Sequence, residues 1–174
     1  MNRESGESMQ ELVRRISERR PLGQDAQANR FVRRAGEPDT QLYAHHNERL
    51  GIEFLVERLD FPGAQTLDPR IVRIPPGRNN ERHRHAHESI FVVLRGRGQV
   101  LIGTTWHDVR AGSFAFVPRW VFHQSRNTGS LEDLVVLAIA DLGLTRAVLG
   151  NYDRGTRLKE GSADARPCDS TEVA

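Results

Sequence analysis

The sequence predicts an all-β fold, an antiparallel sandwich or barrel, and two observations support this prediction. Between residues 50 and 140, apolar residues recur in many short segments with the two-residue period of a strand. Turn-forming residues separate most of these segments, and glycines are spaced evenly among them. The turns are expected at Pro75-Pro76-Gly77, Gly96-Arg97-Gly98, Gly103, Gly112 and Gly129.

The expected strands follow one another closely along this central part of the chain. They are Ile52–Arg58, Arg70–Ile74, Glu81–His87, Ser89–Arg95, Gln99–Ile102, Trp106–Val109, Ser113–Val117, Val121–Ser125 and Leu134–Ala140. One short amphipathic helix is expected before them, opened by the capping box Ser8-Met9-Gln10-Glu11 and ended by Pro21. We therefore expect an N-terminal helix and extension over residues 1–48, a β-barrel over 49–145, and a flexible, polar C-terminal tail over 146–174.

Composition narrows the classes of function. The formal net charge of the 174 residues is +2, which gives no electrostatic argument for a nucleic-acid or membrane partner. Cys168 is the one cysteine, so no internal disulfide can form. No apolar run reaches membrane-spanning length and no signal-peptide core is evident, so a cytoplasmic location is expected.

Three histidines carry the chemical signal. His83 and His85 are two residues apart, and a strand sends every second side chain to the same face. His123 lies in a separate apolar segment that could form a neighbouring strand. Three neutral imidazoles that meet in an apolar pocket form a site for a transition metal such as Fe, Zn, Ni or Cu.

Two glycine-framed motifs around these histidines resemble those of the cupin family. The first runs from Gly77 to Gly96 and contains His83 and His85; the second runs from Gly112 to Asn127 and contains Pro118 and His123. The resemblance covers roughly residues 70–143 and implies a double-stranded β-helix, the jelly-roll barrel of cupins. It also implies that His83, His85 and His123 are metal ligands.

Two departures from the family pattern point to one branch of it. The metal-binding glutamate of the family aligns with Ser89, and Glu88 is one residue away, which would turn its side chain to the opposite face of the strand. Trp120 stands where the motif has glycine. Both features resemble the gentisate dioxygenase branch, which binds iron through three histidines without the glutamate.

This resemblance and the strand parity suggest roles for further residues. Ser89 is expected to face the cavity and to orient oxygen or substrate, and His87 to lie at the rim or to support the ligands. The expected substrate-binding residues are Phe91, Trp120, Phe122 and Ser125. An arginine is expected to bind a substrate carboxylate, and the candidates are Arg73, Arg78, Arg82 and Arg126.

The function that the resemblance implies is an Fe(II)-dependent dioxygenase of a small chelating substrate, aromatic or carboxylate, with O2 as co-substrate. Zn, Ni, Mn or Co are alternative metals. A non-oxidative metalloenzyme (an isomerase, lyase or hydrolase) and a non-catalytic ligand-binding cupin are alternative functions. A homodimer is expected, because cupins of this kind usually form dimers.

Overall fold

The computed structural model describes residues 9–17, 31–34, 40–61, 64 and 66–149. The expected C-terminal tail, from residue 150 onward, lies outside the described residues. The helical elements are α1 (Met9–Ser17), the 3-10 helix η2 (Glu48–Leu50) and α3 (Leu142–Leu149). The strands are β1 (Thr40–Asn47), β2 (Ile52–Arg58), β3 (Asp68–Ile74), β4 (Ser89–Arg95), β5 (Arg97–Ile102), β6 (Thr105–Arg110), β7 (Phe114–Val117), β8 (His123–Asn127) and β9 (Leu134–Ala140).

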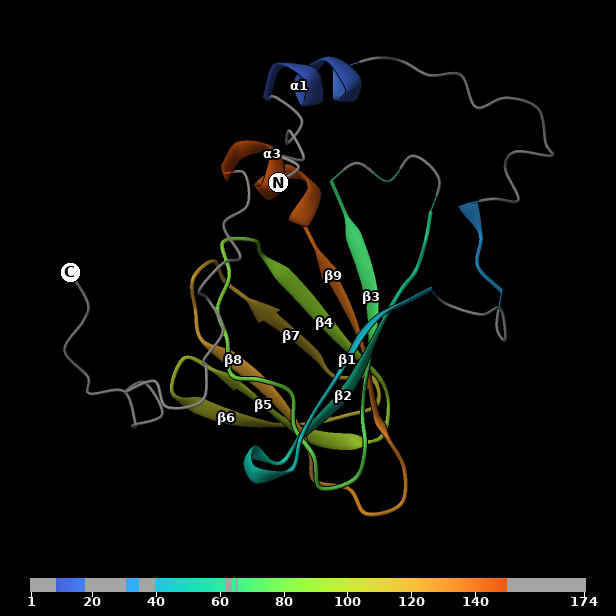
Figure 1. The fold of residues 1–174 in the computed structure, drawn as a ribbon, viewed down its shortest axis with the longest axis vertical. Coiled ribbons are helices and arrows are strands. Elements are labelled where there is room, and N and C mark those ends of the chain that lie inside the picture. The colour runs from blue at the N-terminus through green and yellow to red at the C-terminus, as the bar shows by residue number, and fades with distance from the viewer. Residues whose placement is uncertain (1–8, 18–30, 35–39, 62–63, 65, 150–174) are drawn as a thin grey trace.

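The strands form two antiparallel sheets that face each other, which confirms the all-β jelly roll (Figure 1). The larger sheet has the order β1-β2-β3-β9-β4-β7, and the smaller one has the order β6-β5-β8. Strands that are neighbours in a sheet are often distant in sequence: β3 and β4 both pair with β9. These crossovers are typical of a jelly roll, in which the two sheets close around one core.

The core fills the space between the sheets and follows the two-residue period of the strands. On β4, Ser89, Phe91 and Val93 are buried, whereas Ile90 and Leu94 are exposed on the outer face. The same alternation buries every second residue of β2 from Ile52 to Val56. Near the beginnings of β3, β4 and β8 the buried positions carry the polar residues Asp68, Ser89 and His123 instead of apolar ones.

Three elements differ from the sequence prediction. The expected strand Glu81–His87 is a loop that makes one isolated bridge, between His83 and His123. Strand β1 was not predicted, because it is mostly exposed and its register shifts between Gln41 and Tyr43, which breaks the alternation. Helix α3 was not predicted either, and it occupies part of the expected tail.

In Figure 1, α1 and α3 lie together at one end of the barrel, beyond the ends of β3 and β9. No helix in the described part of the chain is long and apolar enough to cross a membrane.

Candidate metal centre

The backbone brings His83 opposite His123. The N–H of His83 donates to the carbonyl of His123 at 3.1 Å, and the N–H of His123 donates to the carbonyl of His83 at 2.9 Å. Such a reciprocal pair places the two side chains on the same face. His85 is held by a third backbone bond, from the N–H of Trp120 to the His85 carbonyl at 2.8 Å. The three imidazoles therefore share a cavity, as the sequence predicts, but His83 and His85 lie on a loop and not on a strand.

Each of the three imidazoles has its Nδ1 next to a backbone carbonyl two residues away. The Nδ1–O distances are 2.8 Å from His83 to Glu81, 2.9 Å from His85 to His87 and 3.0 Å from His123 to Val121. A neutral imidazole that donates from Nδ1 keeps its Nε2 lone pair free to accept or to bind a metal. The tautomer inferred from these bonds is thus the same for all three rings.

The nitrogen atoms of the three rings converge. One ligand atom from each of His83, His85 and His123 lies within 4.8 Å of the others. The ring centroids of His83 and His123 are 4.3 Å apart, and those of His85 and His123 are 4.5 Å apart. No carboxylate belongs to this cluster among the described residues.

His123 provides the test of whether a metal fits. Its side chain is 1% exposed, and its Nε2 is buried with no hydrogen-bond partner among the residues described. Burial, and then neighbouring His85, lower the pKa of His123 from 6.5 to about 4, although the hydrogen bond with Val121 opposes this shift, so the ring is neutral at physiological pH. A buried acceptor without a partner is costly, and a cation bound by the three rings would satisfy it. The three histidines therefore fit a divalent metal.

The cluster opens into a cavity of about 180 Å³. Ser89 and Phe91 of β4 line it, as the strand parity predicted, and so does His87. The ring of His87 stacks on His85 with centroids 3.4 Å apart. Burial, and then the charge of Arg70, lower the pKa of His87 from 6.5 to about 4, although Asp141 opposes this shift. Glu88 is exposed and is not among the residues that line the cavity.

Three residues expected to bind substrate are not among those that line the cavity. Phe122 faces the other way from His123 because the two are adjacent, and its ring lies under the guanidinium groups of Arg82 and Arg84. Trp120 is 47% exposed. Ser125 is buried, and its backbone N–H donates to Oδ1 of Asn80 at 2.7 Å.

The arginines at the cavity are not the candidates that the sequence suggested. Arg73 pairs with Glu57 at 2.6 Å, outside the cavity. Arg78 pairs with Glu48 and Glu53, Arg82 lies on Phe122, and Arg126 lies on Trp106. The cavity is instead lined by Arg70 of β3 and Arg146 of α3. Arg70 has the inward parity of its strand, a signal that the sequence contained, whereas Arg146 depends on a helix that was not expected.

Two acidic residues also line the cavity, and sequence reasoning missed both. Asp68 accepts hydrogen bonds on Oδ2 from Nε of Arg70 at 2.9 Å and from Nη2 at 2.5 Å. Glu81 lies 2.5 Å from Nδ1 of His45, on β1. His45 thus contacts a residue of the cavity wall.

Comparison with known proteins agrees with this geometry. Residues 70–140 match the family described as "Cupin domain". An auxin-binding protein of Nicotiana tabacum is 33% identical over a match that covers 44% of this chain and 46% of its own length. The chain thus spans about half the length of the curated relatives that it matches first.

Solved structures give the same fold. A cupin 2 conserved barrel protein from Rhodopseudomonas palustris has a TM-score of 0.52 and 25% identity over 61% of this chain and 72% of its own. A protein from Thermotoga maritima described as a predicted oxalate decarboxylase has a TM-score of 0.54 and 24% identity over 63% of this chain and 97% of its own. A salicylate 1,2-dioxygenase from Pseudoaminobacter salicylatoxidans has a TM-score of 0.50 and 18% identity over 55% of this chain and 28% of its own.

Proposed function

We propose that this chain, whose residues 70–140 are a cupin domain, is an Fe(II)-dependent dioxygenase of a small aromatic or other chelating acid. The observation that carries the proposal is the convergence of three imidazole nitrogens in a cluster that, among the described residues, includes no carboxylate. Three neutral ligands leave the full charge on a divalent ion and leave about three octahedral positions open. Such a site suits an anionic substrate that binds through two oxygens, with O2 beside it.

His83, His85 and His123 would hold the iron, and the metal would supply the redox chemistry that side chains lack. The carbonyls of Glu81, His87 and Val121 fix the orientation of the three rings, because each accepts a hydrogen bond from an Nδ1. The protein therefore presents its ligands in a fixed geometry before a metal arrives.

The remaining wall residues would select and orient the substrate. The cavity of about 180 Å³ is comparable to the roughly 150 Å³ cavity known to hold benzene, so a single substituted ring fits it. Phe91 offers an apolar face to that ring, and the hydroxyl of Ser89 can donate to a substrate oxygen. Arg70 and Arg146 offer positive charge to a carboxylate.

Oxygen uptake by the protein loaded anaerobically with Fe(II) tests this proposal. The panel should span gentisate, salicylates, hydroxynaphthoates, catechols, thiols and β-diketones, with Zn(II)-loaded protein as the control. We expect uptake with a hydroxylated aromatic acid, only in the iron form. If the protein holds iron but consumes no oxygen with any compound, the dioxygenase proposal is wrong.

Two observations favour an alternative without oxygen chemistry. Three histidines with an open position are also a common zinc site, suited to hydrolysis, decarboxylation or isomerisation. The tobacco relative is named for binding auxin, which would fit a cupin that binds a ligand without converting it. Metal analysis of protein purified without added metal distinguishes these alternatives from the dioxygenase, since native zinc would favour the alternatives.

The cytoplasmic location and the homodimer stay predictions. Size-exclusion chromatography with light scattering tests the dimer.

A further inference from the structure

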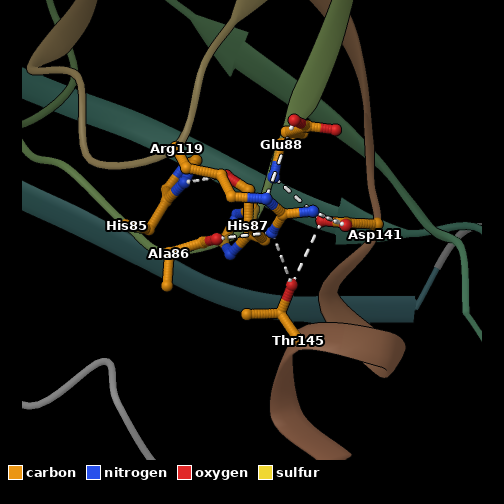
Figure 2. A network of polar contacts seen from close by, with 7 residues as sticks. All are labelled: His85, Ala86, His87, Glu88, Arg119, Asp141 and Thr145. Atoms are coloured by element: carbon orange, nitrogen blue, oxygen red, sulfur yellow. Dashed lines mark hydrogen bonds and ion pairs between the residues drawn. The ribbon is translucent and has the colours of Figure 1, made fainter. Parts of the chain in front are cut away.

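Arg119, on the connection between β7 and β8, contacts two segments that are far apart in sequence, one around Ala86 and Glu88 and one from Asp141 to Thr145 (Figure 2). Its Nη1 donates to the carbonyl of Ala86 at 2.6 Å and to Oγ1 of Thr145 at 3.1 Å. Its Nη2 donates to Oδ2 of Asp141 at 2.5 Å. Its Nε lies 3.6 Å from the carboxylate of Glu88. One guanidinium thus joins the segment that carries His85 to the beginning of α3.

Asp141 completes this connection from the other side. It directly precedes α3, and its carbonyl accepts the first helical hydrogen bond, from the N–H of Thr145 at 3.0 Å. Its Oδ1 accepts from the N–H of Glu88 at 2.8 Å and from the hydroxyl of Thr145 at 3.2 Å. Burial alone would raise the pKa of Asp141, but its hydrogen bonds, first that from Arg119, hold the pKa below its usual value. The carboxylate therefore stays charged and paired.

The position of α3 matters to the cavity because Leu142 and Arg146 line it. A helix of eight residues is not stable on its own and needs tertiary contacts to stay in place. The contacts at its beginning include those of Arg119 with Asp141 and Thr145, a bond from the N–H of Asp141 to the carbonyl of Glu88 at 3.3 Å, and a bond from the N–H of Gly143 to the carbonyl of Thr66 at 3.1 Å. Loss of Arg119 would remove two of these contacts.

We propose that Arg119 is a positioning residue of the cavity, which latches α3 to the segment His85–Glu88 and thereby places Arg146 at the cavity wall. The latch itself is inferred from the hydrogen bonds of Arg119. Its effect on ligand binding rests on the proposed function, in which Arg146 contacts an anionic group of the substrate. Arg119 acts through α3 and does not line the cavity itself.

A surface ion pair usually contributes little to stability, so the latch needs a matched control. The chain offers one in Arg73 and Glu57, which pair at 2.6 Å with side chains 34% and 18% exposed. Arg119 and Asp141 pair at 2.5 Å with side chains 40% and 19% exposed. The two pairs match in distance and burial, but the Arg73 pair lies away from the cavity. An effect seen in Arg119→Gln but not in Arg73→Gln is therefore caused by loss of the connection between α3 and the segment His85–Glu88.

The first experiment compares amide hydrogen exchange in the full-length wild type, Arg119→Gln and Arg73→Gln, all without added metal. We expect the amides of α3 to exchange about tenfold faster in Arg119→Gln, the factor for one charge-assisted hydrogen bond, and at the wild-type rate in Arg73→Gln. Equal protection of α3 in wild type and Arg119→Gln would overturn the latch. So would equal loss in both variants, because the effect would then be general destabilisation.

The second experiment is a double-mutant cycle on salicylate affinity, measured by calorimetry with Zn(II)-loaded protein. Arg146→Gln should weaken salicylate binding about tenfold in the wild-type background but less than about twofold when Arg119→Gln is already present. Additive losses would mean that Arg119 does not act through Arg146. If the wild type does not bind salicylate, the ligand assumed under the proposed function is wrong, and the exchange measurement alone decides on the latch.

Discussion

The two ends of the cavity differ in how their side chains are held. At the metal end, backbone carbonyls orient the rings of His83, His85 and His123, and burial keeps His123 neutral. Arg70 and Arg146 form the charged wall of the same cavity, where side-chain contacts or a short helix hold them in place. The metal end and Arg70 are thus held by the barrel itself, whereas Arg146 depends on α3, a helix added to the barrel. This difference teaches that metal affinity and ligand selectivity should respond to separate substitutions.

The largest expected effect concerns the metal end. His123→Ala should lower the affinity for Fe(II) or Zn(II) by more than about 100-fold, beyond the loss typical of residues that only support a ligand. The measurement is metal content after equilibrium dialysis, with circular dichroism to show that the variant folds. His107→Ala, which removes an exposed histidine from β6, is the control and should keep the metal. Retention of metal by His123→Ala would remove the basis for a three-histidine site.

The metal end could be predicted from sequence because its signal is local. His83 and His85 are two residues apart, and the glycine-framed motifs fix their distance from the turns. The strand expected there does not form, but the two backbone hydrogen bonds between His83 and His123 still place their side chains on the same face. In the charged wall, the strand period gives a signal for Arg70, but Arg146 could not be predicted in this way. Arg146 reaches the cavity only through α3, whose anchors, Arg119 and Thr66, are distant in sequence.

The stability of the metal-free protein should depend on pH because of two histidines at the metal end, His87 and His123. The folded protein holds the pKa of His87 and of His123 at about 4, against 6.5 when the chain is unfolded. Between these values the unfolded chain binds more protons, so stability falls as the pH falls from about 6.5 to about 4. We expect a loss on the order of a few kcal/mol in the free energy of unfolding, measured with urea.

Two additions to this titration sharpen the comparison of the two ends. Saturating Zn(II) should shift the loss to lower pH, because the metal competes with protons for the three rings. His87→Gln should make the dependence shallower, whereas His107→Gln should leave it unchanged. A flat stability profile from pH 7 to pH 4 would show that these imidazoles are not held neutral.

At the charged wall, the expected effect is on selectivity. Arg146→Gln should lower the preference of the Zn(II)-loaded protein for salicylate over salicylamide by about tenfold, as expected for one charge-assisted hydrogen bond, with metal content unchanged. Calorimetric titration of both compounds measures this preference. Arg126→Gln is the control, because Arg126 contacts Gln99 and Trp106 on the smaller sheet. An unchanged preference would remove Arg146 from the ligand site.

Ser89 lines the same cavity as the histidines and the arginines, and a carboxylate can be tested there directly. It is 3% exposed and occupies the position where the family motif has its glutamate. Ser89→Glu should keep the metal and change turnover several-fold, because an anionic ligand reduces the charge on the ion. Ser89→Ala, which removes only the hydroxyl, should have a smaller effect. If neither substitution changes turnover, Ser89 does not orient the substrate and is only a small residue that leaves space in the cavity.

The smallest effect is expected at Trp120, where the backbone matters more than the side chain. Its φ is 62°, a left-handed conformation that costs an L-residue about 1–2 kcal/mol and explains why the family motif has glycine there. Its N–H holds the carbonyl of His85, and glycine would keep this bond. Relief of strain in Trp120→Gly is offset by the greater chain entropy of glycine, so the free energy of unfolding should change by less than about 1 kcal/mol. Metal content and the preference for salicylate should not change; a large loss of ligand affinity would instead mean that the indole contacts substrate, as the resemblance to gentisate dioxygenases implied.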